Sequence, residues 1–127
     1  MRKMIRVVAV SVVVLGLGGC GVGTGGDTAA SPDAIRMEHL AFAPASRTIP
    51  AGTRLEFVNN GSRALHVLVT GRDAQPKSQA GAPSFGGASG HRSEVGERWV
   101  TPMWATPGTY SVTCTLHPSM NLTVTVL

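Results

Sequence analysis

Two stretches near the C-terminus constrain the fold most, because apolar and polar residues alternate strictly along both. In residues 109–114, the side chains of Tyr110, Val112 and Cys114 fall on one face. In residues 121–127, leucine and valine alternate with threonine. A period of two is typical of a β-strand with one buried face. The sequence therefore predicts two strands here, with Cys114 at the end of the first.

Shorter patterns of the β type lie upstream, separated by Gly, Pro and Asn turn signals. The predicted strands cover residues 35–40, 48–49, 54–58, 65–70 and 97–106. No segment shows a convincing helical period. Short strands between such turns favour an all-β sandwich or barrel, and we place this single domain at residues 34–127. A domain of this size is marginally stable, so a bound metal would help it.

Residues 71–96 interrupt the strand pattern. They are rich in Gly, Ala, Ser, Pro and Gln and contain few apolar residues. We expect a surface loop there, with at most a short strand or turn inside it. Trp99 and Trp104, in the predicted strand that follows, are expected to be core or edge aromatics.

The N-terminal end is typical of an export signal. A basic start is followed by an apolar run at residues 7–17, which is too short for the roughly 20 residues that a membrane span needs. The run ends in Leu-Gly-Gly before Cys20, which is similar to a bacterial lipobox. Residues 1–19 are therefore predicted to be a lipoprotein signal peptide, with Cys20 lipidated. An ordinary cleaved signal and a short uncleaved anchor remain alternatives.

Residues 20–33 form the predicted link between the lipid and the domain. Apart from Cys20 they are mostly small and polar and lack any periodicity, so we expect a flexible tether. The expected location is the cell envelope, on the extracytoplasmic side, lipid-anchored to a membrane. Acyl chains at Cys20 would give stable anchoring, since more than one chain is attached there.

The charge of the chain depends on its signal segment. The sequence has 11 Lys and Arg against 7 Asp and Glu, and Arg2, Lys3 and Arg6 precede Cys20. The mature chain thus keeps eight basic and seven acidic residues, a net charge of +1. It has no run of Lys or Arg, which excludes nucleic acid as an expected partner.

Cysteine usage leaves one thiol to explain. Of the two cysteines, Cys20 is assigned to lipid, so Cys114 has no partner. An exported protein meets an oxidising compartment, where cysteines usually pair. Ligation to a metal is a good reason for a single thiol to persist there.

The loop after the first C-terminal strand carries a metal-binding pattern. Cys114, His117 and Met120 lie within seven residues, so one loop can wrap all three around a single ion. Thiolate and imidazole are strong copper ligands, and thioether is a weak axial one. A Cys with two His and an axial Met is the arrangement of blue-copper electron-transfer sites.

The second histidine must come from another segment. His66 follows the turn at residues 59–62 and lies on an apolar strand, whereas His39 has no turn before it. His91 lies in the low-complexity segment. We therefore choose His66 and expect His39 and His91 to be ordinary structural or surface residues.

With these motifs in place, the chain resembles the plastocyanin and amicyanin branch of the cupredoxins over residues 35–127, with 71–96 poorly matched. The short spacing of the Cys-His-Met loop resembles amicyanin. The other matching motifs are residues 42–44, 50–53, 57–60 and 107–110.

The resemblance implies a Greek-key β-sandwich and one type 1 copper. It implies that His66, Cys114 and His117 are equatorial ligands and Met120 the axial one. It also matches Asn60 to an asparagine that ties the two ligand-bearing segments together by hydrogen bonds, which orients the ligands.

The expected function is one-electron transfer at the extracytoplasmic membrane surface, with a redox protein as partner and a monomeric chain. The alternative is an envelope copper store or metallochaperone, because the same soft ligands select Cu(I). The sequence shows no nucleophile with a base partner, no paired carboxylates in a motif and no phosphate-binding loop. We therefore do not expect an enzyme.

Overall fold

The computed structural model describes residues 31–60 and 63–127. The predicted signal peptide (1–19), the lipidation site Cys20 and most of the tether (20–33) lie outside the described residues. In the described ranges the regular structure is β-strand, apart from a 3-10 turn, η1 (Gly87–Ser89). Within these ranges, no helix has the length and apolar character that a membrane crossing needs.

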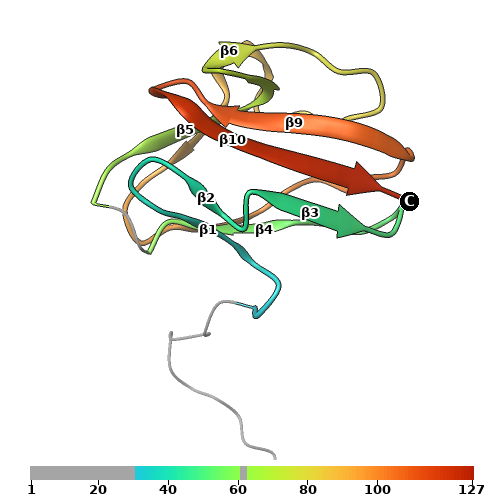
Figure 1. Cartoon of the computed structure of the whole chain (residues 1–127), viewed down its shortest axis with the longest axis horizontal. Helices are drawn as coiled ribbons and strands as arrows, with labels where there is room; N and C mark the ends of the chain where they lie inside the picture. The colour runs from blue at the N-terminus through green and yellow to red at the C-terminus, as the bar shows by residue number, and fades with distance from the viewer. Residues whose placement is uncertain (1–30, 61–62) are drawn as a thin grey trace, which may run out of the picture.

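The strands form two sheets, as predicted for an all-β sandwich. The first sheet has the order β2 (Phe42–Ala43), β1 (Ile35–Met37), β4 (Glu56–Val58), β8 (Arg98–Val100). The second has the order β3 (Ser46–Ile49), β10 (His117–Val126), β9 (Gly108–Cys114), β5 (His66–Arg72), β6 (Gln75–Pro76), and β7 (His91–Ser93) also pairs with β5. Figure 1 shows β9 and β10 side by side in one layer and β1 and β4 in the other.

The two alternating C-terminal stretches are the central hairpin of the second sheet. β9 and β10 pair antiparallel, with Leu122 opposite Val112 and Val124 opposite Tyr110. All four of these side chains are buried, and the residues between them point away from the core. The predicted alternation is therefore confirmed, because only one face of this hairpin packs against the other sheet.

The core lies between the sheets and is dominated by large aromatic side chains. Phe57 of β4 and Trp104 are completely buried, and Met37 of β1 lies in the same cluster. The indole Nε1 of Trp104 donates a hydrogen bond to the Thr101 hydroxyl at 3.0 Å. Trp99 packs against the cluster while partly buried. Both tryptophans are thus core or edge aromatics, as expected.

The strand predicted at residues 97–106 is shorter in the structure. β8 ends at Val100, and Trp104 makes only an isolated bridge to Thr53. Pro102 has no N–H to continue a ladder. The Thr101 hydroxyl instead accepts the backbone N–H of Leu55 at 3.1 Å, so a side chain replaces the ladder bond.

The segment 71–96 contributes more to the fold than a surface loop would. It contains β6, η1 and β7, and Phe85 within it is only 3% exposed. The Phe85 ring meets Phe57 edge to face at 6.1 Å and Trp104 at 5.9 Å. β7 is a short strand of the kind expected inside this segment, but the expectation of a surface loop is wrong for Phe85, because one aromatic anchor is enough to hold a polar segment against the core.

Candidate metal centre

The β9–β10 hairpin positions two of the predicted ligands. Strict alternation along β9 brings Cys114 to the strand end with its side chain in the core, 0% exposed. The chain turns through residues 115–116, and His117 begins β10 directly opposite Cys114. The two residues are thus cross-strand partners, which brings their side chains together.

A β-bulge positions Met120. The pairing of β9 and β10 shifts between His117 and Asn121, which leaves extra residues on the β10 side. Such a bulge changes the direction in which a side chain points. Met120 is fully buried in the same cluster as Cys114, and its carbonyl accepts the Thr113 hydroxyl at 2.9 Å.

The neighbouring strand β5 delivers the histidine from the distant segment. β5 pairs with β9 so that Leu68 lies opposite Cys114, which places His66, the first residue of β5, beside the end of β9. His66 is 0% exposed, and its ring centroid lies 5.1 Å from that of His117. His66 and His117, which are 51 positions apart in the sequence, thus meet at one end of the sandwich.

The three donor atoms form a compact group. One ligand atom from each of His66, Cys114 and His117 lies within 4.8 Å of the others. The Cys114 Sγ is 3.5 Å from Nδ1 of His117, so this nitrogen faces the sulfur. Cys114 is buried and forms no disulfide. A buried thiol grouped with two imidazoles fits a copper ion and has no other evident use.

One main-chain hydrogen bond reaches the sulfur, and a second lies beside it. The N–H of Val67 donates to Cys114 Sγ at 3.4 Å, and the N–H of Thr115 donates to the Val67 carbonyl at 2.9 Å. These bonds join the two ligand-bearing strands around the site. A donor at the sulfur helps to orient it toward the histidines with which it is grouped.

His66 is prepared to bind a metal at neutral pH. Burial, the positive charge of His117 and that of His39 together lower the pKa of His66 from 6.5 to about 4. The ring is therefore neutral at pH 7 and has a lone pair available for a metal. No proton has to be displaced from it.

The asparagine beside the site is Asn59 and not the predicted Asn60. Asn60 is exposed, whereas Asn59 is 0% exposed. The Asn59 side chain donates to the carbonyls of Ala64 and Ser93 at 3.0 and 3.1 Å. It therefore ties the segment before His66 to β7. The period of two that includes Leu55 and Phe57 predicts an inward side chain at residue 59, and this signal identifies the correct asparagine.

The remaining histidines separate into two cases. His91 stacks on Trp99 at 3.8 Å and pairs with Glu97 at 2.6 Å, so it has the structural role that was expected. His39 is an exposed surface residue outside the donor group, as expected, but its ring lies 6.2 Å from that of His117. Sequence reasoning missed this neighbour, since nothing local predicts that the β1–β2 turn meets the β9–β10 loop.

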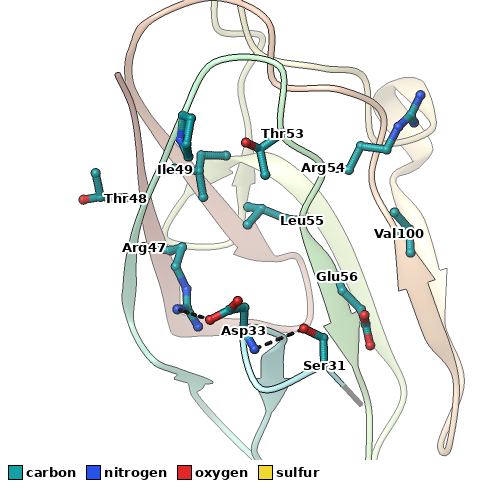
Figure 2. A pocket seen from close by; sticks show the side chains of 11 residues that line it. Ser31, Asp33, Arg47, Thr48, Ile49, Thr53, Arg54, Leu55, Glu56 and Val100 are labelled. Atoms are coloured by element: carbon teal, nitrogen blue, oxygen red, sulfur yellow. Dashed lines mark hydrogen bonds and ion pairs between the residues drawn. The ribbon is translucent and has the colours of Figure 1, made fainter. Parts of the chain in front are cut away.

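A cleft of about 410 Å³ lies away from these ligands, beside β3 and β4 (Figure 2). Its charged side chains already have partners within the chain: Arg47 lies 3.8 Å from Asp33, Glu56 accepts a hydrogen bond from Arg98 at 2.9 Å, and Arg54 donates to the Thr101 carbonyl at 3.2 Å. None of the predicted site residues lines it. The copper-type donor set is therefore separate from this cleft.

A two-sheet sandwich with a buried His-Cys-His group and a Met at one end defines a cupredoxin with a type 1 copper site. No protein-family model matches the chain. It is 38% identical to plastocyanin of Ulva prolifera over 90 residues, which are 68% of this chain and 87% of that protein. Plastocyanin of Ulva arasakii is 37% identical over the same shares. The chain belongs to the plastocyanin family.

Solved structures agree on the fold. A reduced amicyanin variant has a TM-score of 0.59 and 15% identity, over 80% of this chain and 87% of that one. A purple cupredoxin from Nitrosopumilus maritimus has a TM-score of 0.56 and 19% sequence identity, and the match covers 75% of this chain and 100% of that one. A copper-containing nitrite reductase from Thermus scotoductus has a TM-score of 0.57 and 25% sequence identity. That match covers 76% of this chain but only 22% of the reductase chain. The chain therefore corresponds to a whole small cupredoxin and to one part of that larger enzyme.

Proposed function

We propose that the protein is a one-electron carrier. The observation that supports this most is that the ligands are held by the strands themselves: Cys114 and His117 are cross-strand partners, and the Val67 amide is bonded to the sulfur. When bound, copper supplies one-electron exchange between Cu(I) and Cu(II). A main-chain frame that keeps the donors in place lowers the rearrangement that such an exchange requires.

Each donor has a proposed role. His66, Cys114 and His117 serve as the equatorial ligands, because their donor atoms are grouped within 4.8 Å. Met120 serves as the weak axial ligand, since it is buried where the bulge brings β10 back to the core. The thiolate and imidazoles hold the ion, and the thioether tunes its potential.

The proposed route for the electron is the edge of His117. Its ring is partly exposed, while the other three donors are completely buried. Leu116 beside it is 51% exposed, and Leu40, next to His39 in the facing turn, is 49% exposed. An apolar rim around a partly exposed ligand suits brief docking of a redox partner, because it can be desolvated cheaply on contact.

The proposed location is the extracytoplasmic face of a membrane, with lipid on Cys20 and residues 20–33 as the tether. A tether would let the His117 end reach membrane-bound redox proteins. The monomeric state and the redox partner are parts of the same proposal. The test is Cys20→Ser, which we expect to release the protein from the membrane fraction. Retention of this variant in the membrane fraction would contradict lipid anchoring.

Voltammetry of the copper-loaded protein tests the carrier function. We expect a reversible one-electron wave and rapid oxidation and reduction by small redox reagents. A colourless protein that holds only Cu(I) and passes it to a copper-free acceptor would contradict the proposal. That result would instead favour the copper store or metallochaperone.

A further inference from the structure

The β1–β2 turn presents a histidine that the copper site does not use. Residues 38–41 form a tight turn in which the Glu38 N–H donates to the Ala41 carbonyl at 2.8 Å. His39 is exposed in this turn. Its ring centroid lies 6.2 Å from that of His117, and the two planes are inclined by 50°. An imidazole thus lies at the surface next to the most accessible ligand.

Three histidine rings therefore form a series from solvent to the buried site. His39 is exposed, His117 is partly buried and His66 is 0% exposed. The successive ring centroids are 6.2 and 5.1 Å apart. The Nδ1 of His117 lies 3.5 Å from Cys114 Sγ, so this nitrogen is the one beside the buried donors.

Because most of the site is buried, a copper ion cannot reach all four donors directly from solvent. His66, Cys114 and Met120 have no exposed surface, so His117 is the donor that solvent reaches. An ion that arrives in water or on another carrier must exchange its ligands in steps. A surface imidazole that binds copper beside His117 would stabilise the first step, because neutral imidazole is a good copper ligand.

We propose that His39 is a capture ligand for copper loading: it binds the incoming ion together with His117 and releases it to His66 and Cys114. The lone pair of His39 is replaced by that of His66, and the Cys114 thiol loses its proton to water as the thiolate ligates. The oxidation state of the ion does not change, so no oxidant or reductant is needed. This inference rests on the copper site of the proposed function but not on electron transfer.

The test compares copper uptake by metal-free protein with and without His39. Aqueous Cu(II) is mixed rapidly with the protein, and the growth of the visible band gives the loading rate. A chelator added to loaded protein gives the removal rate. For His39→Gln we expect both rates to fall by about tenfold, with the final spectrum and the copper affinity unchanged. The loading and removal rates should fall by the same factor, because a ligand that binds copper only during the transfer changes the activation barrier and not the free energy of the loaded protein.

Two control variants separate capture from general effects. Ala41→Gln changes an exposed residue of the same turn, and His91→Gln removes a histidine that lies outside the series. Both should load at the wild-type rate. Wild-type rates in His39→Gln would overturn the proposal, whatever that variant does to electron exchange with a partner. A changed spectrum or affinity would also overturn it, since His39 would then act in the final site.

The two proposals fail in different ways. A protein that binds copper at a His39-dependent rate but shows no reversible electron wave would contradict the carrier function and leave the capture role intact. A reversible electron wave together with loading rates that do not depend on His39 would support the carrier function and contradict the capture role.

Discussion

The backbone N–H of Val67 donates a hydrogen bond of 3.4 Å to the Sγ of Cys114. Val67 directly follows His66, so this amide links the strand that carries one ligand to the sulfur of another. Because the donor is the backbone N–H, any residue except proline at position 67 could make this bond, and a valine is sufficient. The bond orients the sulfur and would help to set the potential of a bound metal. The ligand frame is therefore built into strand pairing.

Asn59 contributes to this frame from outside the ligand set. Asn59→Ala removes two side-chain hydrogen bonds, one to the Ala64 carbonyl and a buried one to the Ser93 carbonyl. We expect the free energy of unfolding of the copper-free protein to fall by about 2 kcal/mol, as measured by denaturant unfolding. Asn60→Ala, at the exposed neighbouring position, should change it by less than about 0.5 kcal/mol. Equal effects of the two substitutions would contradict the assignment of Asn59.

The anchoring of residues 71–96 through Phe85 is testable in the same way. Phe85→Ala removes a ring that is 3% exposed and packs on Phe57 and Trp104. We expect a loss of about 3 kcal/mol or more in unfolding free energy. Val95, in the same segment, is 58% exposed, and Val95→Ala should have little effect. A neutral Phe85→Ala would mean that this segment lies on the surface after all.

The stability of the copper-free protein should depend on pH through His66. Its pKa is about 4 in the folded protein and 6.5 in the unfolded chain. Between these values the unfolded chain binds a proton that the folded one does not, so stability falls as pH falls from 6.5 to 4. The loss attributable to His66 is about 3 kcal/mol, and it is complete below pH 4.

The measurement is denaturant unfolding of copper-free protein at a series of pH values. Carboxylates also titrate near the acid end of this window, so His66→Gln provides the reference. The wild-type protein should lose more stability than this variant as pH is lowered. The same pH slope in both proteins would show that His66 is not held neutral by its surroundings.

Met120 should affect the potential more than the fold. Met120→Leu is a swap of similar volume at a fully buried position, so the cost in stability should be below about 1.5 kcal/mol. Loss of the weak thioether donor disfavours Cu(II) relative to Cu(I). Voltammetry should therefore show copper still bound and a higher midpoint potential. An unchanged potential would remove Met120 from the ligand set.

Sequence alone predicted the parts of the site that local pattern encodes. Cys114, His117 and Met120 lie on one strand end and one loop, so their proximity follows from their spacing. His66 was selected because a turn and an apolar strand surround it. The all-β class followed from alternation and turn residues, since one-sided burial leaves a period of two. The choice of a two-sheet sandwich over a barrel came from the family resemblance.

Other features depended on contacts between distant segments. Phe85 lies in a polar segment, and nothing near it in the sequence indicates that its ring enters the core. His39 lies beside His117 only because the β1–β2 turn meets the β9–β10 loop. Asn59 is an intermediate case: the period of two in β4 was a signal that could have identified it, but the match to a family motif selected its neighbour Asn60.

The most direct test of a type 1 copper centre is the visible spectrum of the copper-loaded protein, recorded beside Cys114→Ser. We expect the wild-type protein to be intensely blue, with one copper per chain, because charge transfer from the Cys114 thiolate to Cu(II) produces the colour. The serine variant, which lacks the thiolate, should have no such band. A blue Cys114→Ser variant, or a wild-type protein that binds Cu(II) without colour, would contradict the assignment of this site.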